Sequence, residues 1–256
     1  MGKYICFEGS EGVGKTTQVT NLVKYLREQG YKVLETKEPG TVHSPLTLEL
    51  RKLMLDDKYN QLGSAKLAED LKIVLNNPDF QSHLTPTAKE YLTAKFNEVS
   101  ELEKISSHSR EYISQAIRNI HLQKVVAPCL AEYDYIVQDR GILSGLSYGV
   151  AGGVDLGFMI SLNNQAVVES GLGEKYQDCY DQIILLQGNV SKGLSRALSA
   201  KQEFESGDVM EKRGVSFLEK VNSNFQTFQK EFAKVNAIVV DGKDIEEVFS
   251  EIKQSI

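Results

Sequence analysis

Five short apolar segments recur along the chain, and longer stretches with helical periodicity separate them. The segments are Lys3–Phe7, Lys32–Thr36, Tyr135–Gln138, Ile183–Leu186 and Ala237–Val240. Runs of this length and composition suit buried strands. Strands that alternate with helices predict an α/β fold, in which helices cover both faces of a five-stranded parallel sheet. Ligands of such sheets bind where the carboxyl ends of the strands meet.

A glycine-rich loop follows the first segment. From Gly9 to Thr16 the sequence reads GSEGVGKT, which fits the phosphate-binding pattern G-x-x-x-x-G-K-[ST]. A helical stripe comes next, formed by Val19, Leu22, Val23 and Leu26. The alternative is a chance glycine-rich turn before a helix. The complete pattern between a strand and a helix favours a site for a nucleoside triphosphate.

The residue types of this loop suit phosphate chemistry. Glycines let the backbone approach an anion closely, and the amides and the dipole at the start of a helix attract it. Lys15 is expected to reach the β and γ phosphates of a nucleoside triphosphate, and the Thr16 hydroxyl to ligate Mg²⁺. The candidate nucleotide-binding residues of the loop are Gly9, Ser10, Glu11, Gly12, Val13, Gly14, Lys15, Thr16 and Thr17.

Charged residues follow two further strands. Lys37 and Glu38 come after the second segment, and Asp139 and Arg140 after the third. Because parallel strands end at one edge of a sheet, we expect these residues to converge with the glycine-rich loop on one crevice. Asp139 and Arg140 could instead form only a salt bridge at the end of their strand.

The segment from Asp56 to Ser109 departs from this alternation and indicates a helical insertion within the domain. Gln61–Asn76 has a helical pattern, and Thr85 suits a cap before Pro86 at the first helical position. A second stripe is formed by Leu92, Phe96, Val99 and Leu102. The charged faces of this insertion are typical of plain solvated surface.

A further helix is predicted after the insertion. Ser109 is the expected N-cap, and Pro128 is expected to kink or end the helix. Arg118 lies among apolar neighbours on this helix, with no acidic residue four positions away. It is either an exposed arginine that snorkels from the surface or a cation that faces the crevice and clamps a phosphate or a base.

Composition excludes several classes of protein. A chain of 256 residues is enough for one α/β domain. No apolar run is long enough to span a bilayer, and a chain that starts directly in a strand is expected to lack a secretory signal. A net charge of −6 argues against a general nucleic-acid binder. We therefore expect a cytoplasmic protein that binds neither nucleic acid nor membrane.

The cysteines and histidines show no spacing typical of a metal site. Cys6, Cys129 and Cys179 are scattered and odd in number, which indicates reduced, buried thiols. The histidines are His43, His83, His108 and His121. Because they are dispersed, each is expected to be structural.

Seven motifs, in chain order, resemble those of the thymidylate kinases, a family of P-loop nucleoside monophosphate kinases. They are FEGSEGVGKTTQ (Phe7–Gln18), KEPGT (Lys37–Thr41), LRKLMLD (Leu50–Asp56), SQAIRNIHL (Ser114–Leu122), QDRGILSGLSYG (Gln138–Gly149), GLSRAL (Gly193–Leu198) and DVMEKRGVSFLEKVNSNF (Asp208–Phe225). The resemblance covers nearly the whole chain apart from the insertion. It implies one kinase domain of the P-loop NTPase fold over residues 1–256, with the insertion at about 57–108 and a lid at about 195–214.

The resemblance implies Mg²⁺-dependent phosphoryl transfer from ATP to a deoxynucleoside 5′-monophosphate, normally dTMP, by a homodimer. In such chemistry the protein positions the reactants and neutralises spread negative charge. The implied catalytic residues are Glu11, Lys15, Asp139, Arg140 and Lys201. The implied metal-site residues are Thr16 and Asp139. The implied substrate-binding residues are Lys37, Glu38, Pro39, Ser114, Arg118, Arg140, Ser144 and Tyr148.

Individual roles follow from the same resemblance. Glu11 would meet the sugar 3′-hydroxyl or a metal-bound water, although it could be only a tolerated loop residue. Arg140 would clamp the acceptor phosphate, and Asp139 would orient Arg140 or the metal shell. Tyr148 would disfavour a 2′-hydroxyl by crowding, unless it is an ordinary core tyrosine. Lys37 stands where the family has arginine, so it keeps the charge but loses the bidentate fork.

The chain departs from the family around the base and in the lid. Ser114 replaces a stacking phenylalanine, which would forfeit about 1 kcal/mol, and Gly149 replaces a glutamine. Ala151–Val154 and Val209 replace two arginines. These changes predict a roomier pocket and leave open a kinase of altered or broad base choice, acting on dGMP, dAMP or others.

Since the loop residues Val13 and Thr17 supply no cation, the lid is expected to supply one on closure, through Arg196 or, more readily, Lys201. Arg196 is accordingly included among the ATP-binding candidates. The few lid cations leave open a third function, that of a nucleotide-binding regulatory protein of low activity.

Overall fold

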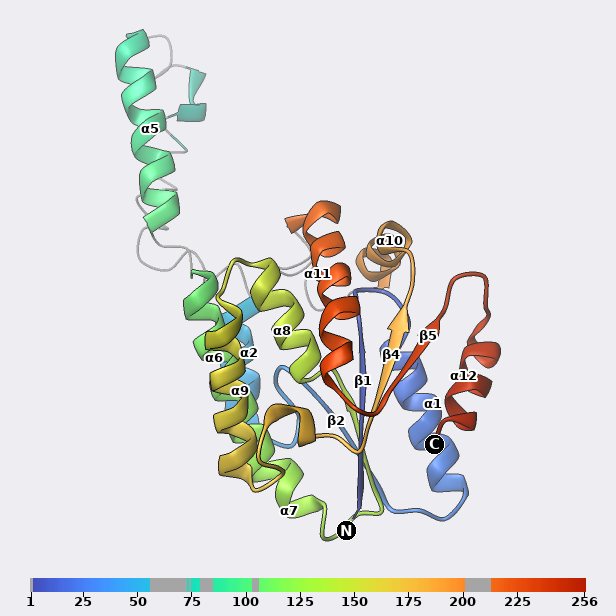
Figure 1. Cartoon of the computed structure of the whole chain (residues 1–256). Coiled ribbons are helices and arrows are strands. Elements are labelled where there is room, and N and C mark those ends of the chain that lie inside the picture. Colours follow the sequence, from blue (N-terminus) through green and yellow to red (C-terminus); the bar gives the residue numbers. More distant parts are fainter. Residues whose placement is uncertain (1, 56–72, 74, 79–84, 103–105, 201–212) are drawn as a thin grey trace.

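A five-stranded parallel sheet forms the centre of the computed structural model (Figure 1). The model describes residues 2–55, 73, 75–78, 85–102, 106–200 and 213–256. The strands are β1 (Lys3–Gly9), β2 (Val33–Lys37), β3 (Tyr135–Asp139), β4 (Gln182–Gln187) and β5 (Val235–Val239). Their order in the sheet is β2-β3-β1-β4-β5, and every neighbouring pair is parallel. The predicted α/β fold is confirmed, and all five strands lie where the apolar segments placed them.

Helices cover both faces of this sheet (Figure 1). One face carries α1 (Lys15–Glu28) and α12 (Ile245–Gln254), and the other carries α6 (Ser107–His121), α8 (Ile142–Ala151), α9 (Leu156–Ser170) and α11 (Val215–Phe228). The remaining helices are α2 (Pro45–Leu55), α5 (Pro86–Leu102), α7 (Ala127–Cys129) and α10 (Val190–Ala200). Short helical turns are η2 (Leu122–Val126, a π-helical turn), η3 (Tyr176–Asp178) and η5 (Gln229–Glu231).

The alternation of side chains along β1 divides the core into two layers. Tyr4 and Cys6 pack among residues of α8, α9 and α11, whereas Ile5 and Phe7 pack among residues of α1 and α12. Successive side chains of a strand point to opposite faces of the sheet, so one apolar strand buries itself on both sides. The sequence of such a strand is a continuous apolar run and not an alternation of apolar and polar residues, as it is in this chain.

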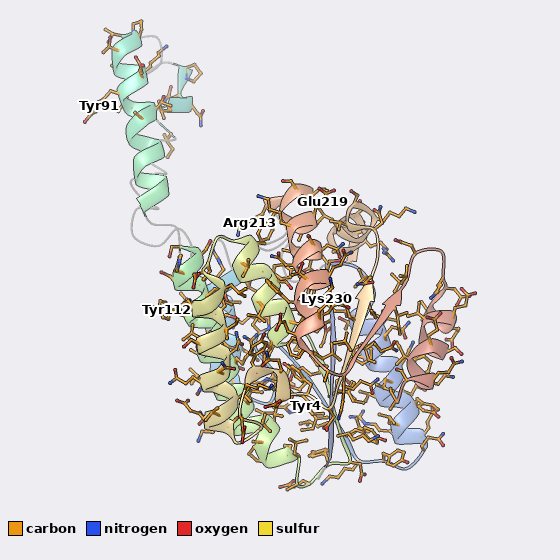
Figure 2. All side chains as sticks on the ribbon, viewed as in Figure 1. Tyr4, Tyr91, Tyr112, Arg213, Glu219 and Lys230 are labelled. Carbon is orange, nitrogen blue, oxygen red and sulfur yellow. The ribbon has the colours of Figure 1, made fainter. Side chains whose placement is uncertain are left out.

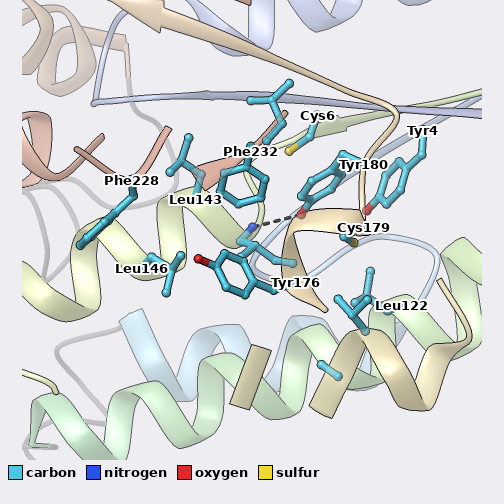
Figure 3. Packing of buried hydrophobic residues seen from close by; sticks show 14 of the residues in the cluster. Tyr4, Cys6, Leu122, Leu143, Leu146, Tyr176, Cys179, Tyr180, Phe228 and Phe232 are labelled. Carbon is cyan, nitrogen blue, oxygen red and sulfur yellow. Dashed lines mark hydrogen bonds between the residues drawn. The ribbon is translucent and has the colours of Figure 1, made fainter. Parts of the chain in front are cut away.

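Tyr180 joins the first of these layers to the start of α8 (Figure 3). Its ring lies 4.8 Å from that of Tyr4, measured between centroids. Its hydroxyl accepts a hydrogen bond of 3.0 Å from the backbone N–H of Ile142, the first residue of α8. The first N–H groups of a helix have no partner within the helix. Tyr180 therefore fixes the helix that follows the third strand.

The helix α5 begins as the sequence predicts. Pro86 is its first residue, and the Thr85 hydroxyl accepts a hydrogen bond of 3.2 Å from the N–H of Ala88. In Figure 1 this helix stands apart from the sheet and its covering helices, and Tyr91 projects from it in Figure 2. The stripe from Leu92 to Leu102 falls within α5. Most of the predicted helix 61–76 lies outside the described residues.

The start of α6 corrects one prediction. Ser106, not Ser109, is the N-cap, and its hydroxyl accepts a hydrogen bond of 3.0 Å from the N–H of Ser109. Ser109 is instead the third residue of the helix. The helix begins in a polar stretch before its apolar stripe, so the stripe alone does not mark where the helix starts. Pro128 lies in α7, and the helical run ends one residue later at Cys129. The prediction that Pro128 ends the run is thus close to the structure.

The described cysteines are all free, with Cys6 and Cys179 buried and Cys129 half-buried. None of the described helices combines the length and the apolar character needed to cross a bilayer.

Candidate active site

One cavity of about 620 Å³ lies where the loops after β1, β2 and β3 converge. It gathers most of the candidate residues proposed from the sequence. Those that line it are Glu11, Gly12, Val13, Gly14, Lys15, Thr16, Thr17, Lys37, Glu38, Pro39, Ser114, Arg118, Asp139, Arg140, Ser144, Tyr148 and Arg196. The expected convergence of the strand ends on one crevice is confirmed. Lys201 lies outside the described residues.

The glycine-rich loop uses two of its glycines for reasons of conformation and space. Gly14, with φ of 94°, is the residue before α1, and a left-handed conformation of this kind favours glycine. Gly12 lies against the backbone of α10, where an added Cβ would come 1.8 Å from the carbonyl oxygen of Gly193. The loop can therefore curl around an anion while α10 packs against its outer side.

Lys15 is buried at the floor of this loop. Its ammonium donates a hydrogen bond of 2.7 Å to the carbonyl oxygen of Ser10. Burial, followed by the positive charge of Arg140, lowers the pKa of Lys15 to about 8. The side chain is thus cationic at neutral pH, and a nearby phosphate would favour that charged form further.

Thr16 and Asp139 meet at the mouth of the loop. The Thr16 hydroxyl donates a hydrogen bond of 2.6 Å to one oxygen of Asp139. The other oxygen, Oδ1, is buried and has no hydrogen-bond partner in the described part of the chain. A hydroxyl beside an unpaired carboxylate oxygen suits Mg²⁺, which takes one or two protein oxygens together with substrate phosphates and water. Among the described residues no cluster of three or more His, Cys, Asp or Glu forms a site made of protein alone.

Arg140 directly follows β3 and lines the same cavity as Lys15. Its guanidinium forms an ion pair of 2.7 Å with Glu11 and donates to the carbonyl oxygen of Gly9 at 3.1 Å. The Tyr148 hydroxyl donates to the same carboxylate oxygen of Glu11 at 3.1 Å. Burial disfavours the charged guanidinium, but Glu11 and its neighbours raise the pKa of Arg140 above its usual value. The ion-pair partner of Arg140 is therefore a loop residue rather than its chain neighbour Asp139.

Arg118 belongs to a buried network that includes Glu38. Its guanidinium donates to Glu38 at 2.8 Å, to Asn163 at 2.8 Å and to the carbonyl oxygen of Gly141 at 3.1 Å. The other oxygen of Glu38 lies 3.1 Å from Nδ1 of His121. Burial acts to raise the pKa of Glu38, but Arg118 and His121 outweigh it, so the pKa is lowered. The alternative of an exposed, snorkelling Arg118 is wrong.

Glu38→Gln is expected to lower the free energy of unfolding at pH 7 by about 3 kcal/mol, because it leaves the buried Arg118 without its counter-charge. Urea denaturation measures this loss. Since folding depresses the pKa of Glu38, its stabilisation is present above the ordinary carboxyl pKa and is lost as pH falls through the folded-state value. The difference between wild type and variant should shrink in acid.

Glu28→Gln is the matched control for that change. Glu28 forms an exposed ion pair with Lys24 at 3.9 Å, and losing such a pair costs under about 1 kcal/mol. Equal losses for the two variants would contradict a stabilising role for the buried network.

Ser144 contacts a residue that sequence reasoning missed. The Ser144 N–H donates a hydrogen bond of 3.1 Å to Glu8, and its hydroxyl also donates to that carboxylate. Glu8 is fully buried within β1, and burial, partly offset by the bonds from Ser144, raises its pKa. The available signal was an acidic residue inside an apolar run. Further cavity residues without a sequence prediction are Arg51, Arg110 and Glu111.

Comparison with known proteins agrees with this geometry. The thymidylate kinase family model matches residues 7–67 and 57–252 of the chain. The chain is 30% identical to a thymidylate kinase of Caldicellulosiruptor saccharolyticus over 256 residues, which cover all of this chain and 96% of that protein. It is also 30% identical to a thymidylate kinase of Geotalea daltonii over 246 residues, or 94% of this chain and 90% of that protein.

A solved structure supports the fold independently. The crystal structure of a thymidylate kinase from Ehrlichia chaffeensis superposes with a TM-score of 0.59 at 20% identity, covering 99% of this chain and 97% of that one. At this identity the likeness concerns the fold alone.

Proposed function

The chain belongs to the thymidylate kinase family, and from this premise we propose that it transfers the γ-phosphoryl group of Mg²⁺-bound ATP to dTMP, giving ADP and dTDP. The observation that carries the proposal is the meeting of Lys15 and Arg140 in one cavity, each after the carboxyl end of one of two adjacent parallel strands. Phosphoryl transfer is catalysed mainly by positioning and by neutralising charge. A buried cation, Lys15, and a partly buried one, Arg140, that line the same cavity suit that task.

The cavity has room for a donor and an acceptor on either side of the phosphate loop. On the donor side it is lined by Val240, Lys243, Asp244, Ile245 and Val248. On the acceptor side it is lined by residues of α2, α6 and α8 together with Lys37, Glu38 and Pro39. This division supports ATP on one side and a nucleoside monophosphate on the other.

We assign the charged residues accordingly. Lys15, which donates to the Ser10 carbonyl, would turn to the β and γ phosphates of ATP. Thr16 and Asp139 would hold Mg²⁺, which when bound neutralises the donor phosphates. Arg140 would hold the acceptor phosphate. Glu11 would orient Arg140, as its ion pair of 2.7 Å supports.

Glu11 also accepts the hydrogen bond from Tyr148. This contact supports placing Tyr148 beside the sugar of the acceptor, where its ring would crowd a 2′-hydroxyl.

The organisation of the domain is also part of the proposal. Residues 57–108 would be an insertion in a single kinase domain, and the two overlapping family matches, which share residues 57–67, support this reading. We propose that residues 195–214 act as a lid, of which 201–212 lie outside the described residues. Arg196, which lines the cavity from α10, supports this proposal. The protein would act in the cytoplasm as a homodimer. The exposed Tyr112 on α6 (Figure 2) and the exposed Val168 on α9 supply apolar surface for such a contact.

Turnover with a panel of nucleotides tests the proposed function. ADP formation is measured with ATP, Mg²⁺ and each of dTMP, dUMP, dCMP, dGMP, dAMP and UMP. We expect dTMP to give the highest kcat/KM, and excess EDTA to abolish turnover until Mg²⁺ is restored. Higher kcat/KM with dGMP or dAMP would favour a kinase of altered base choice. If none of the six nucleotides were turned over, the result would favour a regulatory nucleotide-binding protein.

A further inference from the structure

Glu111 is a buried carboxylate that faces the cavity and takes no part in the roles assigned above. It lies on α6, one helical turn before Ser114, and only 6% of its surface is exposed. It lines the cavity, and its atom Oε2 has no hydrogen-bond partner among the residues that the structure describes. Nearly all buried polar atoms are hydrogen-bonded, so an orphan oxygen beside a cavity indicates a ligand group that would pair with it.

The neighbouring helix is shaped to receive this side chain. An added Cβ at Gly149 of α8 would lie 3.2 Å from the carboxyl carbon of Glu111. One turn earlier on α8, a Cβ at Gly145 would lie 2.9 Å from both terminal nitrogens of Arg118. Two glycines on one side of α8 therefore make space for two charged side chains of α6. A side chain at position 149 would meet first Met159, whose terminal carbon would lie 2.8 Å from the added Cβ, and then the carboxyl group of Glu111.

The position of Glu111 suits the base of the acceptor nucleotide. Arg118 contacts the carbonyl of Gly141, next to Arg140, where the proposed function places the acceptor phosphate. Glu111 lies seven residues earlier on α6, about 10 Å along the helix axis. A nucleotide held by its phosphate at Arg140 and laid along α6 and α8 would bring its base toward Ser114 and Glu111.

The surroundings of Glu111 favour the protonated, neutral form of its carboxyl group. Burial raises the pKa of its carboxyl group to about 7, against the opposing charges of Arg118 and Arg110. These two arginines, both on α6, are the charged groups that act on it. Met159 of α9 and Gly149 of α8 add no charge, and Arg51 of α2 lines the same cavity. Both protonation states are therefore populated near neutral pH.

Resting on the proposed function, we propose that Glu111 is a base-reading residue that pairs with the imide edge of thymine as a neutral carboxylic acid. A neutral acid offers one O–H donor and one acceptor oxygen, whereas a carboxylate only accepts. The imide edge presents a carbonyl acceptor beside an N–H donor, which complements the neutral acid. The edge of cytosine, an amino donor beside the N3 acceptor, complements the neutral acid as well. The carboxylate only accepts, and the single N–H of thymine is flanked by two carbonyl oxygens that repel it, whereas the amino group of cytosine has a repelling atom on one side only. Loss of the proton would thus shift the choice of base from thymine toward cytosine.

The test compares kcat/KM for dTMP and dCMP from pH 6 to 8.5 in wild type, Glu111→Gln and Glu111→Leu, with quantification of the diphosphate products. In wild type the preference for dTMP over dCMP should fall about tenfold across this range, because the neutral acid is lost as pH rises through the pKa. Glu111→Gln, always neutral with one donor and one acceptor, should keep the preference and remove its pH dependence. Glu111→Leu should raise KM for dTMP about tenfold and leave KM for ATP unchanged.

Gln115→Leu is the matched control, since Gln115 is also buried on α6, one turn further on, but does not line the cavity. It should leave the preference and its pH dependence as in wild type. Glu111→Gln with the wild-type pH profile, or Glu111→Leu with an unchanged KM for dTMP, would overturn the proposal.

If wild type turned over no dTMP at any pH, the proposed function would fail. The role of Glu111 would then be decided by calorimetry of dTMP binding to the same variants. Equal affinities of wild type and Glu111→Leu for dTMP would overturn the role.

Discussion

Lys15→Ala is expected to reduce kcat/KM for ATP by about a thousandfold or more. Lys15 is the one buried cation of the phosphate loop itself, within the part of the chain that the structure describes. A preorganised cation in a water-poor site stabilises developing charge far more than an exposed one does. Because the variant removes the charge and leaves the loop backbone in place, we expect the fold to be kept. Steady-state turnover with ATP and dTMP measures the effect.

The pH dependence of kcat/KM for ATP is a second test of the role of Lys15. Lys15 acts as a cation, and its pKa is lowered to about 8. In wild type, kcat/KM for ATP should therefore fall as pH rises through that value, because free enzyme with neutral Lys15 loses its attraction for phosphate. Lys24→Ala is the control, since Lys24 is on the same helix but exposed. A loss of tenfold or less for Lys15→Ala would show that the loop acts through its backbone amides alone.

Arg140→Ala is expected to lower kcat/KM for dTMP by about a hundredfold to a thousandfold, with little change in KM for ATP. Arg140 is the cation nearest Glu11 and the phosphate loop on the acceptor side of the cavity. Its φ of 63° is unusual for a residue with a side chain. Alanine also has a Cβ, so the substitution adds no further backbone strain. Separate kcat and KM values for the two substrates measure the effect.

Arg140→Lys tests the geometry of the same group. One terminal nitrogen of Arg140 donates to Gly9 and Ser144, and the other pairs with Glu11. A lysine has a single ammonium and cannot reproduce this fork. We therefore expect less than tenfold recovery over the alanine variant. Full recovery would show that the position needs only charge, and a drop in melting temperature shared by both variants would indicate a structural role instead.

The fold could be predicted from the sequence because its signals are local. Each strand is one apolar run between helices, and the glycine-rich loop joins the first strand to a helix that begins at Lys15. The start of α6 was placed three residues late, at Ser109 instead of Ser106. Both serines precede the same apolar stripe, and only the hydrogen bonds of the first turn distinguish them.

The candidate site could be predicted only in part. Residues that directly follow a strand, such as Glu38 and Arg140, reach the cavity as the parallel sheet requires. Partners far apart in the chain were missed, because no spacing links Arg118 to Asn163 or Ser144 to Glu8, which are 45 and 136 positions apart. The role of Glu111 depends on the room left by Gly149, which only the packing of two helices reveals.

The pairing of β1 with β3 has a consequence for the precision of the reaction. Phe7 and Asp139 are partners across the two strands, and the N–H of Arg140 donates a hydrogen bond of 2.8 Å to the carbonyl of Phe7. The loop that we propose to cradle the donor and the arginine that we propose to hold the acceptor thus emerge from adjacent strands, roughly 4.8 Å apart. A misplacement of about 1 Å can slow a reaction a hundredfold. Under the proposed assignment, the spacing of the two reacting groups is set by the backbone hydrogen bonds that pair β1 with β3.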